Sequence, residues 1–118
     1  DGIEYLEAAK VPEAIRSFDE AIKQNPADPH PYLVLGQTYM RINDYTRAID
    51  TFSAALRVSP DKGSLHYLIA VNYQLLGEVD LARKNVEASI EFFRQKQDEK
   101  NFLMAIALLQ ELSQEQKN

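Results

Sequence analysis

The chain has 118 residues and a formal net charge of −5, with 45% hydrophobic and 26% charged residues. Its length suits one domain with a continuous core, and its composition is that of an ordinary globular protein, neither disordered nor fibrous. The negative charge argues against nucleic-acid binding, which normally needs a basic face. The sequence contains no cysteine, which excludes disulfides and cysteine-based metal sites or nucleophiles.

No apolar stretch approaches the roughly 18 residues that a membrane-spanning helix needs, and no signal peptide is visible. We therefore expect no membrane span. The chain begins at Asp1 inside a predicted helix and so reads as a fragment, which leaves open whether a targeting segment has been removed. Localisation stays open, with the cytoplasm slightly favoured.

Residues 1–28 are predicted to contain the second half of one helix, over residues 1–8, and a complete second helix. The second helix should begin at Pro12, since a proline in the first turn of a helix loses no hydrogen bond. Apolar residues then follow at helical spacing, namely Ala14, Ile15, Phe18, Ala21 and Ile22. The helix should end before Pro26, because the residue preceding a proline is disfavoured in helical conformation.

Residues 29–62 are predicted to form a helical hairpin. Asp28 and Pro29 are an N-cap and a first-turn proline, and Asp44 should cap the second helix, which ends at Ser59-Pro60. Gly36 lies in the interior of the first helix, where glycine costs about 1 kcal/mol relative to alanine. We interpret Gly36 as a point of close approach to the second helix, with Ala48 as the small facing residue.

Residues 63–96 are predicted to form a second hairpin after a turn over residues 61–64. Its first helix should run to about Leu76, where Gly77 provides a left-handed stop. Its second helix should cover about Val79 to Gln95.

Residues 97–118 are predicted to contain a helix near Asp98 to Ser113, with eight consecutive apolar residues from Phe102 to Leu109. A helix that is apolar on all sides is normally buried. We expect three residues to cover the preceding hairpin, namely Leu103, Ile106 and Ala107. Three others would remain for another subunit, a partner or a groove, namely Phe102, Met104 and Leu109.

Residues 34 positions apart match along the chain, which indicates a repeat protein. Gly36 corresponds to Gly2 and Ala70, and Phe52 corresponds to Phe18 and Val86. The middle unit combines a large aromatic residue, Leu-Gly, Tyr, Ala, Phe, Ala and Pro at fixed places, namely Tyr32, Leu35, Gly36, Tyr39, Ala48, Phe52, Ala55 and Pro60.

This pattern resembles the signature of the tetratricopeptide repeat family. The resemblance covers roughly residues 1–96; the third unit departs from it with His66 at the large-aromatic place and Arg94 instead of proline. It implies an all-α, right-handed solenoid of helical hairpins, with about 2.5–3 repeats and a C-terminal capping helix. The expected boundaries are 1–28 for a truncated first repeat, 29–62 and 63–96 for the next two, and 97–118 for the capping helix and tail.

No combination of residues predicts catalysis. His30 and His66 are the only histidines, and neither belongs to a metal-binding motif. We expect His66 to pack at its aromatic place and His30 to be solvated. The sequence also lacks the glycine-rich loops and the GxSxG context that phosphate binding and serine hydrolysis use. We therefore expect no enzyme, no cofactor and no metal site.

The family resemblance implies peptide binding on the concave face, which the first helix of each hairpin lines. The positions implied in the first repeat are Ile3, Leu6 and Glu7, and the best candidates in the later repeats are Gln37, Met40, Arg41, Tyr67, Val71 and Gln74. Relatives that clamp chaperone carboxylates carry Lys, Asn and Arg at places that are here Leu33, Val34, Ser64 and Leu68, so the clamp is absent. The apolar residues of these helices, namely Leu33, Val34, Leu68 and Leu75, either line the groove or pack between neighbouring repeats.

Two functional hypotheses follow. The first is a non-catalytic scaffold that binds a peptide or an amphipathic helix from another protein in its concave groove. The second is self-association, including a homodimer, through the apolar C-terminal helix and the incomplete first repeat, because exposed apolar patches are usually covered.

Overall fold

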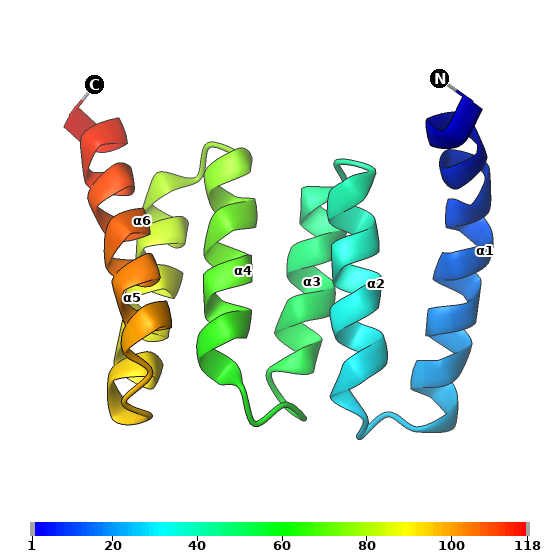
Figure 1. Ribbon diagram of the computed structural model, residues 1–118, viewed down its shortest axis with the longest axis horizontal. Helices are drawn as coiled ribbons and strands as arrows, with labels where there is room; N and C mark the ends of the chain where they lie inside the picture. Colours follow the sequence, from blue (N-terminus) through cyan, green and yellow to red (C-terminus); the bar gives the residue numbers. More distant parts are fainter. Residues whose placement is uncertain (1, 118) are drawn as a thin grey trace. The chain divides into compact units, whose positions relative to one another are not determined.

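The computed structural model describes the backbone of residues 2–117 and the side chains of residues 10–115, which form six α-helices and no strand (Figure 1). The predicted all-α fold is confirmed. The chain divides into two compact units, residues 1–58 with helices α1 to α3 and residues 59–118 with helices α4 to α6. The side chains of Ile3, Leu6 and Glu7 lie outside the described residues.

In unit 1, α1 spans Gly2–Gln24, α2 spans Pro29–Arg41 and α3 spans Tyr45–Ala55. Both predicted N-caps are confirmed. The Asp28 carboxylate accepts a hydrogen bond of 3.0 Å from the His30 backbone N–H, and that of Asp44 accepts one of 3.2 Å from the Arg47 N–H. These caps satisfy backbone donors that have no partner within the helix.

The predicted break before Pro12 is wrong, because α1 is one continuous helix with Pro12 in its interior. The equivalent reversals within the next two hairpins each contain a residue in the left-handed conformation, Asn43 with φ 62° and Gly77 with φ 79°. The repeat equivalent of Asn43 in the first unit is Ala9, which has no preference for that conformation. The sequence therefore lacks the residue that would turn the chain at this place.

The α2–α3 hairpin is held together by a close contact at Gly36. A Cβ atom on this residue would lie 2.7 and 2.8 Å from the Cζ and Cδ1 atoms of Phe52, which leaves no room for a side chain. The predicted close approach is thus confirmed, although the nearest facing residue is Phe52 and not Ala48. Phe52 is completely buried, as are Ala48 and Ala55 on the same face of α3.

In unit 2, α4 spans Lys62–Leu75, α5 spans Val79–Gln95 and α6 spans Glu99–Lys117. The bounds of α5 and the left-handed stop at Gly77 agree with the prediction. Helix α4 begins earlier than expected, within the segment predicted to be a turn, because Asp61 caps it by accepting a 3.2 Å hydrogen bond from the Ser64 N–H.

The core of unit 2 combines residues from all three of its helices, namely Ala70, Ala82, Val86, Phe93, Ala105, Leu108 and Leu112. A second close contact lies at Gly63, where a Cβ atom would come 2.8 Å from Cε1 of Phe93. The buried Ser89 hydroxyl donates a 2.9 Å hydrogen bond to the Gly63 carbonyl. Gly63 therefore joins α4 to α5, a role that its place in a predicted turn did not indicate.

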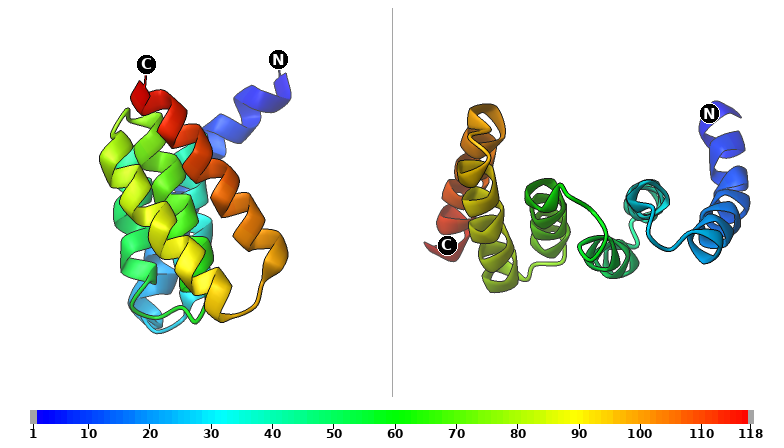
Figure 2. Two further views of the ribbon diagram at one scale, coloured as in Figure 1. Left: turned by 90° about the vertical axis from the view of Figure 1, so that its left-hand side faces the viewer. Right: turned by 90° about the horizontal axis from the view of Figure 1, so that it is seen from below.

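The predicted inner face of α6 is wrong at two of its three residues, since only Ile106 is half-buried. Leu103 is 56% exposed and Ala107 is also exposed, whereas Ala105, Leu108 and Leu112 are buried. An unbroken apolar run has no polar side, so its periodicity does not fix the rotation of the helix. In the structure, Ala105, Leu108 and Leu112 pack into the core of unit 2, and Asp98 at the α5–α6 turn caps the helix by accepting a 3.2 Å hydrogen bond from the Asn101 N–H. Figure 2 shows α6 following this turn and running beside α5.

Candidate functional site

The predicted groove residues of unit 1 lie together on α2. Gln37 and Arg41 are exposed, and Met40 is half-buried. Their spacing of three and four residues puts them on one side of the helix. Unit 1 therefore presents a mixed surface of an amide, a thioether and a guanidinium group, called the α2 face below.

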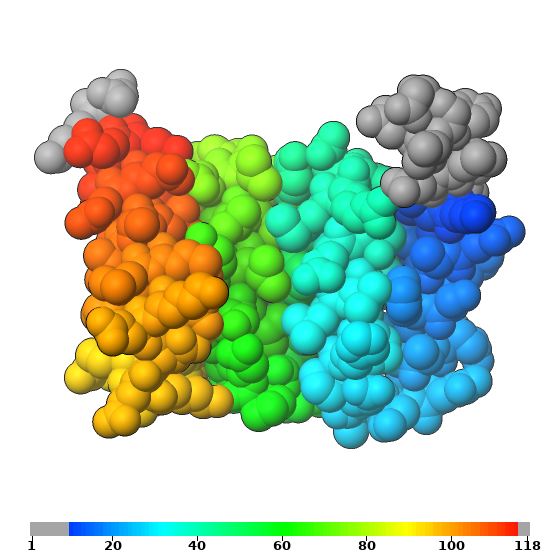
Figure 3. Space-filling model, in the orientation of Figure 1, coloured from blue at the N-terminus to red at the C-terminus, as the bar shows by residue number. Residues whose placement is uncertain are grey.

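The predicted groove residues of unit 2 lie together on α4, on a side that contacts α6. Tyr67 and Val71 are half-buried and pack against the core of unit 2. The Gln74 amide nitrogen donates hydrogen bonds of 2.8 Å to Glu111 and 3.0 Å to Glu115, both on α6. Figure 3 shows the orange and red surface of α6 lying directly against the green surface of α4. We call Tyr67, Val71 and Gln74 the α4 face.

The electrostatic environment of Tyr67 reflects the same contact. Burial raises the pKa of its phenol above the ordinary value, and the negative charge of Glu111 raises that pKa further. Both effects disfavour the ionised phenolate. The pKa of Tyr67 therefore reports how closely α6 approaches α4.

A hollow of about 210 Å³ lies in unit 1 between α1 and α2. Its lining comprises Lys10, Val11 and Ala14 from α1 with Thr38 and Arg41 from α2. The Thr38 hydroxyl donates a 2.8 Å hydrogen bond to the Val34 carbonyl of its own helix. Two cationic side chains thus border a partly apolar depression, an arrangement that suits an amphipathic segment with carboxylates. Lys10 was missed in the sequence because it lies in the expected turn.

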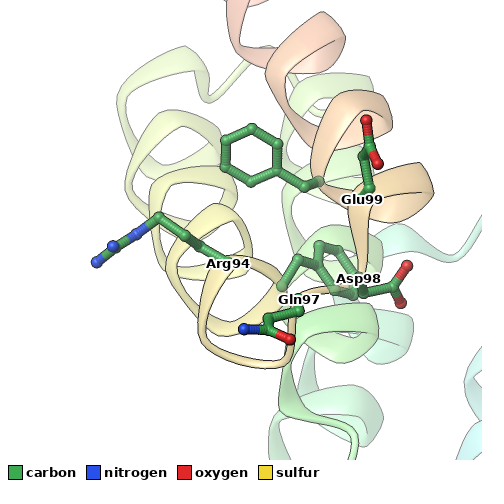
Figure 4. Close-up of a pocket in the computed structure, with 6 residues that line it drawn as sticks. Arg94, Gln97, Asp98 and Glu99 are labelled. Carbon is green, nitrogen blue, oxygen red and sulfur yellow. The ribbon is translucent and has the colours of Figure 1, made fainter.

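A second hollow, of about 290 Å³, lies at the α5–α6 turn of unit 2 and is lined by Phe93, Arg94, Gln97, Asp98, Glu99 and Phe102. Figure 4 shows that its labelled polar side chains point in different directions. Arg94 forms an ion pair with Glu91, and its hydrogen bond lowers the pKa of the Glu91 carboxyl. Asp98 is occupied in capping α6. These groups do not converge as acid–base catalysis requires.

The three residues predicted for self-association differ in their exposure. Phe102 and Leu109 are half-buried and pack against the core of unit 2. Met104 is 42% exposed, and the neighbouring Leu103 is also exposed. The outer side of α6 therefore presents Leu103 and Met104 rather than the predicted trio.

The histidines have the predicted environments. The ring of His66 stacks on Phe92 with a centroid distance of 5.7 Å, and its Nδ1 lies 3.1 Å from the Asn85 amide oxygen. His30 is exposed in the first turn of α2. Among the described side chains, no three His, Cys, Asp or Glu residues come together as metal ligands. None of the helices in the described part of the chain is both long and apolar enough to span a membrane.

The sequence profile of the tetratricopeptide repeat family matches residues 2–62 and 33–102. The chain belongs to this family. Its sequence is 31% identical to Superkiller protein 3 of Schizosaccharomyces pombe over 69% of the chain, and 27% identical to Superkiller complex protein 3 of Homo sapiens over 65% of the chain. The chain spans only 6% and 5% of the length of these two relatives.

Solved structures of tetratricopeptide-type helical repeats share the fold. The PcrH structure, a complex with the chaperone-binding region of PopD, covers 98% of this chain with a TM-score of 0.81 and 18% identity, and 87% of its own chain is matched. The TPR2B domain of yeast Sti1, in complex with an Hsp70 peptide, covers 98% of this chain with a TM-score of 0.79 and 19% identity, and 92% of that chain is matched. The predicted solenoid class is therefore confirmed.

Proposed function

We propose that this chain is a non-catalytic protein-interaction scaffold, and that the α2 face contacts a peptide or an amphipathic helix from a partner protein. The observation that carries the proposal is the exposure of Gln37 and Arg41 beside the half-buried Met40. Methionine adapts to irregular apolar surfaces, while glutamine and arginine supply hydrogen-bond donors around it. The peptide complexes of PcrH and Sti1 support the same class of function.

The α4 face is a separate candidate surface in unit 2, but a partner would meet competition there. Gln74 already bonds to Glu111 and Glu115, and Tyr67 is half-buried near Glu111. A partner that binds Gln74 has to replace these charge-assisted hydrogen bonds, which are stronger than neutral ones. We therefore assign the larger share of the binding free energy to the α2 face.

We propose that the ligand is apolar or amphipathic and is not held by a two-carboxylate clamp. The places that would carry the clamp have the half-buried residues Leu33, Val34, Ser64 and Leu68. None of these side chains is a cation, so a terminal carboxylate would lack its charged partners there. The ligand would instead be held by apolar contacts beside Arg41.

Selection of peptides from a displayed library on the intact chain tests this function. Peptides that bind should lose at least about fivefold in affinity for Met40→Ala, since truncating a central interface side chain can cost about 1 kcal/mol or more. Gln110→Ala changes an exposed residue of α6 and is the matched control. Binding that is equally insensitive to both substitutions would contradict the assignment of the α2 face.

A second candidate function is self-association through α6. The observation in its favour is the exposure of two adjacent apolar residues, Leu103 at 56% and Met104 at 42%. Replacing both by glutamate should convert an α6-mediated dimer to a monomer, as measured by light scattering. A solution mass that these substitutions do not change would exclude α6 as the interface.

A further inference from the structure

The end of α5 departs from the pattern of the preceding repeat. Helix α5 runs through Gln95, whereas α3, the equivalent helix of the preceding hairpin, ends at Ala55. The closing proline of that hairpin is Pro60, and its repeat equivalent is Arg94. Because Arg94 keeps its backbone N–H and does not constrain the residue before it, α5 can continue through this position. The additional residues of α5 include Phe93, which lines the hollow at the α5–α6 turn.

Two aromatic rings line this hollow, which has a volume of about 290 Å³. Phe93 is buried and lies against Gly63, while Phe102 is half-buried and packs against the core of unit 2. An apolar cavity of about 150 Å³ is large enough to bind benzene. The hollow therefore has room for one further aromatic side chain, which would pair with these rings edge to face or in an offset stack.

Hydrogen bonds hold the walls of the hollow in place. The Asp98 N–H donates a bond of 2.9 Å to the Phe93 carbonyl, and the Phe102 N–H donates one of 2.9 Å to the Asp98 carbonyl. The Lys96 ammonium donates a 2.9 Å bond to the Pro60 carbonyl, which ties the end of α5 to the segment before α4. A site that is already ordered in this way loses little conformational freedom when a ligand binds.

The polar border of the hollow is acidic. Glu99 is exposed in the first turn of α6. Asp98 accepts two hydrogen bonds from Asn101, which leave its negative charge in place. The guanidinium group of Arg94 is paired with Glu91 and points away from Asp98 and Glu99 (Figure 4). The hollow thus presents two carboxylates beside its aromatic lining, and these favour a ligand that carries a positive charge.

We propose that this hollow binds a segment of a partner protein in which an aromatic side chain stands next to a lysine or an arginine. The aromatic ring would lie against Phe93 and Phe102, and the adjacent cation would meet the carboxylates of Asp98 and Glu99. Hydrogen bonds between groups of opposite charge are shorter and stronger than neutral ones. The hollow belongs to unit 2, so this surface is separate from the α2 face and does not depend on the proposal made for that face.

Capped dipeptides titrated into the intact chain test this chemistry, with the backbone amide signals followed by two-dimensional NMR. Acetyl-Phe-Lys-amide should cause saturable shifts of the amide signals of Gln97 and Phe102. Its dissociation constant should be at least about fivefold lower than those of acetyl-Ser-Lys-amide, which lacks the ring, and acetyl-Phe-Glu-amide, which lacks the cation. No saturable shift at these residues, or equal affinities for the three peptides, would overturn the proposal.

A charge reversal tests the acidic border on the same chain. Glu99→Lys should raise the dissociation constant of acetyl-Phe-Lys-amide at least about fivefold, because a like charge would then face the ammonium group of the peptide. Glu78→Lys is the matched control, since Glu78 is also exposed and lies at the other end of α5, about 24 Å along the helix from Arg94. Equal weakening by both substitutions would mean that only the net charge attracts the peptide, and would overturn the assignment of the hollow.

Discussion

The α2 face and the α4 face occupy the same place in successive repeats but have different surroundings. Val71 is apolar, half-buried and packed against the core of unit 2, whereas the equivalent Gln37 is polar and exposed. Gln74 donates hydrogen bonds to α6, whereas the thioether of the equivalent Met40 has no donor with which to form such bonds. The repeat register thus sets where a residue lies on its helix. The polarity of the residue and the presence of a neighbouring helix then decide whether that residue stabilises its unit or remains accessible to a partner.

The largest expected effect comes from breaking the close contact between α2 and α3 at Gly36. Gly36→Leu should lower the free energy of unfolding by about 3 kcal/mol, because the new side chain would overlap the Phe52 ring. Urea denaturation measures this loss. Gly77→Asn is the control, because no atom lies within 4 Å of a Cβ there and asparagine tolerates its positive φ. Equal losses would show that the Phe52 contact is not what requires glycine.

Removing the packing of α6 should have the next largest effect. Leu112→Ala should cost about 2–3 kcal/mol of stability, because Leu112 is completely buried but lies near the end of the last helix. Leu103→Ala, on the exposed side of the same helix, should change stability by no more than about 0.5 kcal/mol. If thermal unfolding gave the reverse order, the inner face expected from the sequence would be right and the observed rotation of α6 wrong.

Truncating one residue in each face sharpens the comparison further. Tyr67→Ala should lower the free energy of unfolding by about 1–2 kcal/mol, because Tyr67 is half-buried against the core, and it should also weaken partner binding. Gln37→Ala should weaken binding with a stability change below about 0.5 kcal/mol. A loss for Tyr67→Ala as large as that for Gly36→Leu would make Tyr67 a core residue and remove it from the binding site.

The smallest expected effect is a change in a tyrosine pKa. Glu111→Gln should lower the raised pKa of Tyr67, since it removes a nearby negative charge, although burial would still keep that pKa above 10.0. Ultraviolet titration of each protein against its Tyr67→Phe counterpart isolates this phenol. Because the folded pKa is the higher one, the associated stability is present below the unfolded pKa and is lost as pH rises through the folded value. An unchanged Tyr67 pKa would mean that α6 does not approach Tyr67 at Glu111.

The sequence was sufficient for features that depend on local chemistry or on the repeat. The caps at Asp28 and Asp44, the stop at Gly77 and the close contact at Gly36 were all predicted from residue type and position. Such features depend on short-range sterics and on backbone hydrogen bonds, which act within a few residues. The repeat register extended them from one hairpin to the next.

The sequence was insufficient where the answer depends on contacts between distant helices. The bond from Gln74 to Glu111 joins residues 37 positions apart and requires a particular rotation of α6. The apolar run from Phe102 to Leu109 does not specify that rotation. The continuous α1 was missed for another reason, because Pro12 is compatible with a first turn but does not by itself create the reversal that precedes one.

The most direct test of the difference between the two faces is the reactivity of single cysteines at equivalent positions. Gln37→Cys and Val71→Cys can be compared because the natural chain has no other thiol. We expect the thiol at position 37 to react with a disulfide reagent about tenfold faster than the thiol at position 71 in the folded protein, and equally fast in denaturant. Equal rates in the folded protein would contradict the account, because α6 would then leave the α4 face as open as the α2 face.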